Sequence, residues 1–222
     1  MPMTAVLAAG VGARHGWGWS LRSASFRLES PPSGQPALGI LIPEHSSGGT
    51  VVDLLSGLIA PAYGELRVLG EDMRTERGRA AVRSRIGVVH RTSRARPGIK
   101  IRGLVEQAAR RTRLPRRDRT VLTAAILDRL SLSPWADVAL RAAPDPIARR
   151  ARLASAAVHQ PELLLIDGLL DGLAPSDAIA LADYIRDIGV DSGIVAAGND
   201  AEWLALTCPE ILTLEDGILV GG

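Results

Sequence analysis

The sequence predicts an α/β fold, because strand-like and helix-like segments alternate along most of the 222-residue chain. Continuous apolar runs at residues 163–166 and 192–197 are typical of buried parallel strands. Segments with helical apolar spacing, at 147–159 and 177–188, precede each of these runs. The first run ends in Asp167, at the carboxyl end of the predicted strand, where α/β proteins place their sites.

Residues 39–58 (GILIPEHSSGGTVVDLLSGL) form the stretch around which the prediction is organised. An apolar run, a Gly/Ser-rich turn and a second apolar run predict strand, loop and helix, the layout of a phosphate-binding loop. The pattern GxxxxGK[ST] falls on residues 43–50. Gly48 and Thr50 fit it, whereas Pro43 and Gly49 replace its first Gly and its Lys. The stretch is therefore either a worn phosphate site or a purely structural turn.

The other elements follow from local patterns. Alternating or short apolar segments predict further strands at 19–28, 37–42, 65–69 and 86–89, and helical spacing predicts helices at 50–58, 77–84 and 201–207. Residues 211–215 and 218–220, separated by Asp216-Gly217, predict a terminal hairpin.

The middle of the chain differs, because helical spacing at 101–113 and 120–132 is interrupted only around Pro115. We expect a helical insert over residues 92–144 between two parts of a core, 1–91 and 145–222. The stripe expected to be apolar on the second helix contains Val121, Leu122, Ala125, Ile126 and Leu130.

Arginines are concentrated in this insert, at positions 110, 111, 113, 116, 117 and 119. The cluster is either a solvated turn or a surface for an anionic partner or membrane. It lacks interleaved aromatic residues, so nucleic-acid binding is not favoured.

Composition sets broad limits. Apolar residues make up 46% of the chain, charged residues 23%, and the formal net charge is +2, as in an ordinary globular domain. The single cysteine, Cys208, excludes an intramolecular disulfide and fits a reducing cytosol. We expect neither a signal peptide nor a membrane span, because the N-terminus lacks a basic region and no apolar run is long enough.

Four segments together resemble the nucleotide-binding subunit of an ABC transporter over essentially the whole chain. They are SGLIAPAYGELRVLGEDM after the loop, IGVVHR, HQPELLLIDG and ILTLEDGILV. The resemblance implies a P-loop NTPase (ABC-ATPase-like) fold with a RecA-like core, an N-terminal antiparallel β part and the inserted helical subdomain.

The resemblance also implies roles for single positions, and this chain departs from most of them. Gly49 stands where the family has the phosphate-loop Lys, and Arg91 where it has the Q-loop Gln. Asp167 matches the Walker B Asp, but Gly168 replaces the general-base Glu, and Asn199 replaces the switch His.

Two further motifs are altered. The LSGGQ signature falls on residues 143–147, where we expect Asp145 to cap a helix that begins with Pro146. The D-loop falls on 171–174 and lacks its final Asp. The adenine-stacking aromatic aligns with His15, while Trp17 and Trp19 lie close in sequence and could instead cover a sheet edge or an interface.

Only Thr50 and Asp167 persist among the eight positions that carry chemistry in the family. We therefore expect no catalytic residues, no metal site and no tightly bound cofactor, with weak Mg·ATP binding left open. A vestigial nucleotide site would comprise Ser47, Gly48, Gly49, Thr50 and Asp167, with His15 as a candidate for adenine stacking.

The resulting hypothesis is a degenerate subunit that docks on a membrane permease at the cytoplasmic face of the membrane. It would pair with another ABC-type subunit, as a homodimer or a heterodimer, and would not bind nucleic acid. The alternatives are a weak ATPase that uses Thr50 and Asp167, with His45 or Arg91 supplying the lost charge, and an adaptor unrelated to transport.

Overall fold

The structure is a computed structural model that describes residues 4–15, 18–29, 37–42, 49–92, 95–112, 114–190 and 192–221. Its strands are β1 (Thr4–His15), β2 (Gly18–Glu29), β3 (Ala37–Leu41), β4 (Tyr63–Val68), β5 (Glu71–Asp72), β6 (Ile86–Val89), β7 (Leu163–Asp167), β8 (Gly193–Gly198), β9 (Glu210–Glu215) and β10 (Ile218–Gly221). Its helices are α1 (Gly49–Leu55), α2 (Glu76–Val82), α3 (Ile101–Ala109), α4 (Arg116–Arg129), α5 (Asp145–Ala157), α6 (Pro175–Gly189) and α7 (Ala201–Ala205), with short 3₁₀ turns η1 (Ser133–Trp135) and η2 (Leu140–Ala142).

The ten strands form one mixed sheet in the order β5-β4-β1-β2-β10-β9-β3-β8-β7-β6. Strands β9, β3, β8, β7 and β6 run parallel to one another, whereas β1, β2, β4 and β5 pair antiparallel. Strand β10 joins the two parts, because it pairs antiparallel with β9 and parallel with β2. The α/β fold with an N-terminal antiparallel part is confirmed.

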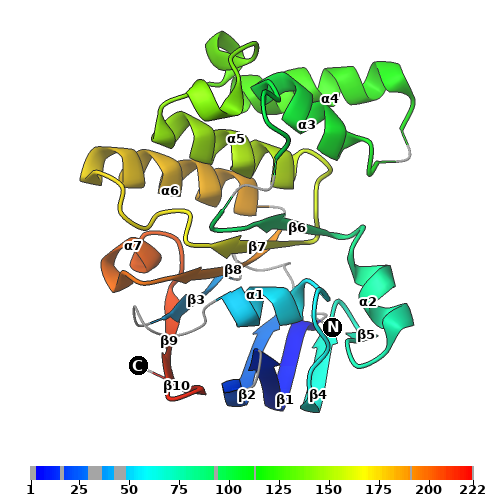
Figure 1. The fold of residues 1–222 in the computed structure, drawn as a ribbon, viewed down its shortest axis with the longest axis vertical. Coiled ribbons are helices and arrows are strands. Elements are labelled where there is room, and N and C mark those ends of the chain that lie inside the picture. The colour runs from blue at the N-terminus through cyan, green and yellow to red at the C-terminus, as the bar shows by residue number, and fades with distance from the viewer. Residues whose placement is uncertain are drawn as a thin grey trace.

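The parallel strands have apolar groups on both faces, because side chains alternate along a strand. In β7, Leu164 and Ile166 pack in one core cluster, with α3 to α6, whereas Leu163 and Leu165 pack in a second cluster, with α1 and the antiparallel strands. Figure 1 shows α3, α4, α5 and α6 gathered beyond one face of the parallel strands, and α1 on the other. The sheet therefore divides two cores and carries loops at its strand ends.

The predicted helical insert contains α3, α4, η1 and η2, and among the described residues 101–112 and 114–142 there is no strand. The isolated backbone bridge between Lys100 and Ala139 ties its two ends together. The predicted limits of the insert, 92 and 144, stay a prediction.

The predicted stripe on α4 is partly wrong. Ile126 and Leu130 are buried, but Val121 is 62% exposed, and Thr123 and Leu127 take places in the buried face. The buried positions are 123, 126, 127 and 130, and the helix packs against α3 and α5, so its inward face differs from the predicted stripe by about one residue position. A polar residue therefore points into the insert.

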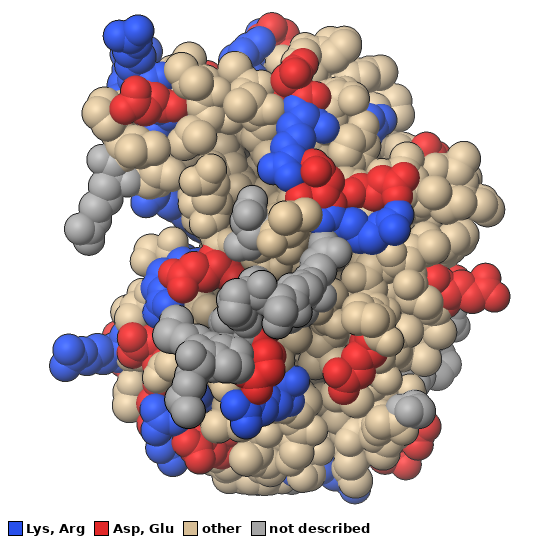
Figure 2. Space-filling model, turned by 180° about the vertical axis from the view of Figure 1, so that it is seen from behind, with Lys and Arg blue, Asp and Glu red and all other residues tan. Residues whose placement is uncertain are grey.

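The surface carries both signs of charge. Figure 2 shows Lys and Arg side chains interspersed with Asp and Glu on the face seen from behind. In the described part of the chain, no helix is both long and apolar enough to cross a membrane.

Candidate functional site

The strand–loop–helix predicted around residues 39–58 is present as β3 and α1, with the helix ending earlier, at Leu55. Gly49 and Thr50 open α1, and Thr50 is 3% exposed. Ser47 and Gly48 lie outside the described residues, as do Pro43 and Glu44. The structure thus places two of the four predicted loop residues, both at the beginning of the helix.

Asp167 is the last residue of β7 and is buried, at 7% exposure. Its carboxylate faces the beginning of α1, because a Cβ built on Gly49 would lie 3.9 Å from Asp167 Oδ2. The structure therefore brings together two of the predicted site residues, Gly49 and Asp167, from elements more than 100 residues apart in sequence.

Arg91 supplies positive charge to the other side of this carboxylate. It follows β6, and its Nε lies 3.5 Å from Asp167 Oδ1 while its Nη2 lies 2.8 Å from Asp171 Oδ2. Neither of these buried oxygens has an aligned hydrogen bond, so the attraction is Coulombic rather than directional. The side chains of both aspartates are about 10% exposed, against 45% for Arg91. The guanidinium therefore lies on the solvent side of two buried carboxylates.

The guanidinium of Arg91 packs directly against the backbone of Gly168. A Cβ built on Gly168 would lie 2.7 Å from Arg91 Cζ, and the residue has φ +60°, which favours glycine. An acidic side chain at this position would have to adopt that backbone and displace Arg91. Gly168 stands where ABC subunits have Glu, and Arg91 where they have Gln. The two replacements are therefore structurally linked, because Arg91 in its present position requires a residue without a side chain at 168.

Asp171 also fixes the loop after β8. Its Oδ1 accepts a hydrogen bond from the backbone N–H of Asn199, at 3.2 Å. Asn199 itself is exposed and directs only its main chain to this carboxylate. Sequence reasoning treated Asp171 merely as the first residue of the D-loop, and nothing local in the sequence marked it as a partner of Arg91.

Helix α5 begins one residue earlier than predicted. Pro144 occupies the N-cap position and Asp145 is the first helical residue, so the expectation that Asp145 caps the helix is wrong. The carboxylate of Asp145 instead accepts from Arg149 Nε at 2.8 Å, one turn along the helix. This pairing satisfies Arg149 at the point where its guanidinium enters the loop after β7.

Arg149 holds that loop in place. Its Nη1 donates to the backbone oxygens of Leu169 (2.8 Å) and Asp171 (2.7 Å), and more distantly to that of Gly168 (3.4 Å). The same loop carries Gly168 and Asp171. Arg149 therefore positions these two residues, which, like Asp167, lie against Arg91. Sequence analysis missed this role, since the donors and acceptors lie about 20 residues apart.

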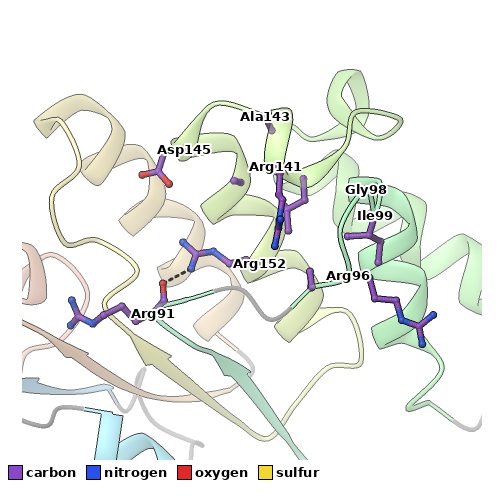
Figure 3. A pocket seen from close by; sticks show the side chains of 11 residues that line it. Arg91, Arg96, Gly98, Ile99, Arg141, Ala143, Asp145 and Arg152 are labelled. Atoms are coloured by element: carbon purple, nitrogen blue, oxygen red, sulfur yellow. Dashed lines mark hydrogen bonds between the residues drawn. The ribbon is translucent and has the colours of Figure 1, made fainter.

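A hollow of about 350 Å³ adjoins the site and is lined by Arg91, by residues 95–99, by η2 and by α5 (Figure 3). Arg152 lies in it and donates to the backbone oxygens of His90 and Arg91, at 3.1 and 2.8 Å. Burial lowers the pKa of Arg152, and the nearby charge of Arg149 adds to the effect. Figure 3 shows the side chain of Arg91 directed away from Arg152. Its guanidinium lies against the carboxylates of Asp167 and Asp171.

The described residues contain no group of three acidic, histidine or cysteine side chains that could hold a metal ion, and the two carboxylates at the site face Arg91. His15, the candidate for adenine stacking, ends β1, but its side chain lies outside what the structure describes, as does Trp17.

Comparison with known proteins agrees with this architecture. The chain is 31% identical over 180 residues to Nod factor export ATP-binding protein I of Bradyrhizobium diazoefficiens, covering 81% of this chain and 58% of that protein. It is 26% identical over 186 residues to methionine import ATP-binding protein MetN 2 of Burkholderia mallei, covering 82% and 47%. In sequence, the chain is similar to ATP-binding subunits of ABC transporters. No protein-family model matches it.

Solved structures of ABC cassettes share the fold. The dimeric structure of MJ0796, a bacterial ABC transporter cassette, aligns with a TM-score of 0.84 at 16% identity, covering 96% of each chain. CbiO1 of Clostridium perfringens, part of the CbiONQ transporter complex, aligns with a TM-score of 0.83 at 16% identity, covering 98% of this chain and 87% of that one. These solved structures cover nearly all of the chain, so the ABC-type fold is shown over nearly its whole length. The chain spans about half the length of the curated relatives it matches.

Proposed function

We propose that this chain is a catalytically degenerate ABC subunit that serves as a structural or regulatory partner in a transporter and does not turn over ATP. The observation that carries the proposal is the position of Arg91, whose guanidinium contacts Asp167 and Asp171. An internal cation here supplies the positive charge that Mg²⁺ would otherwise bring to the acidic end of β7. The chain would then keep this site folded without a nucleotide, with part of its negative charge compensated by Arg91.

The remaining positions support the same interpretation. Phosphoryl transfer depends on positioned charges, and loss of a single stabilising group typically slows such a reaction by roughly 10²–10³-fold. Here Gly49 brings no charge to the beginning of α1, and Gly168 offers no general base. Several such losses together leave little turnover to observe.

Partners follow from the family. CbiO1 is named as part of a transporter complex, and MJ0796 is described as dimeric. We infer that this chain likewise docks on a membrane permease at the cytoplasmic face and pairs with another ABC-type subunit. The relatives are named for methionine import and for Nod factor export, and the transported substrate of this chain stays open because permease subunits select it.

Titration calorimetry with Mg·ATP tests the proposal. We expect no binding at micromolar concentration and no phosphate release by the purified chain. Micromolar affinity, together with turnover that Asp167→Asn abolishes, would reject the proposal.

A restoration series tests the role of Arg91 itself. Arg91→Gln frees the two carboxylates, and Gly49→Lys adds a cation beside Asp167 on the helix side. We expect the double variant to gain measurable Mg·ATP affinity over the wild-type chain. Arg77→Gln, an exposed change of the same charge on α2, serves as the control and should gain none.

The two alternatives make different predictions. A weak ATPase would dimerise on addition of Mg·ATP, as light scattering would show, whereas an unchanged mass speaks against it. An adaptor outside transport would not co-purify with a multispanning membrane protein, whereas the proposed subunit would.

A further inference from the structure

The arginine cluster of the insert surrounds a second hollow, of about 570 Å³, between α3 and α4. The two helices pack against each other and lie on the side of the molecule away from the antiparallel strands (Figure 1). All of its lining residues are polar or charged: Glu106, Arg110, Arg116, Arg119, Thr120 and Thr123. This hollow lies far along the chain from Gly49 and Asp167 and shares no residue with the site described above.

The lining residues follow helical spacing on both walls. On α4, positions 116, 119, 120 and 123 are three or four residues apart, so they share one face. Glu106 and Arg110 stand one turn apart, at the end of α3. The two faces bring three arginines and one glutamate around a common space, an excess of positive charge.

These arginines are not neutralised within the described part of the protein. Arg110 and Arg116 make no side-chain hydrogen bond or ion pair there, and Glu106 pairs with neither. Arg119 donates only to the backbone oxygen of Leu114, at 3.1 Å. The guanidinium groups thus retain donors for a ligand.

A buried hydroxyl in the same hollow has no hydrogen-bond partner among the described residues. Thr123 is 2% exposed, and its Oγ1 makes no hydrogen bond within that part of the chain. Thr120, one position earlier in the same stripe, donates to the backbone oxygen of Arg116 at 3.1 Å, as threonines in helices commonly do. An unpaired hydroxyl in an otherwise buried position costs stability, which a hydrogen-bonding ligand would remove.

The beginning of α4 adds donors at the rim. Pro115 is its N-cap residue and offers no side-chain cap, so the N–H groups of the first turn are open to an anion. We propose that this hollow binds a phosphate-bearing anion, held by Arg110, Arg116 and Arg119, with Thr123 Oγ1 as a further hydrogen-bonding group.

The volume exceeds that of a single phosphate and falls in the range of small-molecule sites, about 300–1,000 Å³. The hollow therefore has room for a phosphate group together with a small attached group. This chemistry occurs both in soluble phosphate esters and in the headgroups of anionic lipids, and the experiment separates the two sources. The inference does not rest on the proposed function.

The soluble arm titrates the full chain with inorganic pyrophosphate by calorimetry. Arg116→Gln removes a lining charge, while Arg117→Gln removes an adjacent, exposed charge of the same helix turn that does not line the hollow. We expect Arg116→Gln to weaken binding at least about tenfold, the order of one charge-assisted hydrogen bond, and Arg117→Gln to change it less than about twofold.

The lipid arm measures sedimentation with phosphatidylcholine vesicles that contain or lack phosphatidic acid, whose headgroup is a phosphate ester. Binding that requires phosphatidic acid and falls with Arg116→Gln but not with Arg117→Gln assigns the site to a lipid headgroup. Binding of pyrophosphate with the same pattern, without sedimentation that requires phosphatidic acid, assigns it to a soluble phosphate compound.

Two results would overturn the proposal. One is the absence of binding in both arms. The other is equal weakening by Arg116→Gln and Arg117→Gln, which would show a general positive surface without a defined site. Thr123→Val provides a further check, because it removes the hydroxyl without changing the charge, and it should also weaken binding severalfold.

Discussion

The backbone of Gly168 lies directly beneath the guanidinium of Arg91, with a built Cβ only 2.7 Å from Arg91 Cζ. The same guanidinium contacts Asp167 and Asp171, so any side chain at 168 must displace it from both acids. The two positions are therefore energetically coupled.

Gly168→Ala should lower the free energy of unfolding by about 1–3 kcal/mol, from its φ of +60° and from the displacement of Arg91. In an Arg91→Gln background, the same change should cost about 1 kcal/mol less, because the shorter side chain leaves room. Urea unfolding of the wild-type, single and double variants measures this coupling. Strictly additive effects would contradict the contact.

Arg149→Gln should lower the free energy of unfolding by about 2–4 kcal/mol, because this guanidinium is largely buried. It removes donors from the backbone oxygens of Leu169 and Asp171 and leaves Asp145 unpaired. Arg77→Gln makes the same chemical change on an exposed part of α2 and should stay within about 0.5 kcal/mol of the wild type. Chemical denaturation compares the two variants. Similar losses of unfolding free energy would show that the hydrogen bonds of Arg149 to the loop after β7 do not stabilise the fold.

Thr123→Val should raise the free energy of unfolding by about 1 kcal/mol in the absence of phosphate, because it removes a buried hydroxyl with no partner. Thr120→Val is the matched control. Its hydroxyl is exposed and bonded to Arg116 O, so its loss should be neutral or slightly destabilising. Thermal unfolding in phosphate-free buffer checks the sign, and a destabilised Thr123→Val would show that this hydroxyl has a partner after all.

His159 makes stability depend on pH below neutrality. Burial lowers its pKa from 6.5, and the charge of Arg111 lowers it further, against the hydrogen bond between Nε2 and Ile86 O. The unfolded chain then binds a proton more readily, so this contribution is fully present above about pH 6.5 and is lost as the pH falls toward the folded pKa.

The expected loss for one such proton is at most about 1.4 kcal/mol per pH unit. Urea unfolding at pH 7.5 and 5.5 should show a larger decrease for the wild type than for His159→Gln, which keeps a donor for Ile86 O. Parallel decreases in both proteins would assign the effect to other groups.

The architecture was predictable from local pattern where apolar runs were continuous. The predicted segments at 163–166 and 86–89 match β7 and β6 almost residue for residue, because strands buried on both faces leave a clear signal. Strand β1 was not predicted from its own residues. It is rich in Ala and Gly and carries irregular register against β2, so it shows little alternation.

The site was predictable in its members but not in its contacts. Position 91 was marked by the family resemblance, and Asp167 by the strand before it, yet their ion pair depends on two parallel strand ends meeting in space. Asp171 and Arg149 were missed because loop residues carry no periodicity. On α4, the predicted stripe included Val121, whereas packing against α3 and α5 buries Thr123.

The strand order has a consequence for how the chain folds during synthesis. Strand β3 pairs with β8 and β9, which follow it by about 150 residues. At about 5–20 residues per second, a ribosome needs roughly ten seconds or more to supply these partners. Through that interval the apolar residues Leu38 and Ile40 have no completed sheet to enter. The nascent chain is therefore exposed to aggregation until β8 and β9 have been synthesised, and its yield in cells should depend on chaperones that bind the unpaired β3 segment.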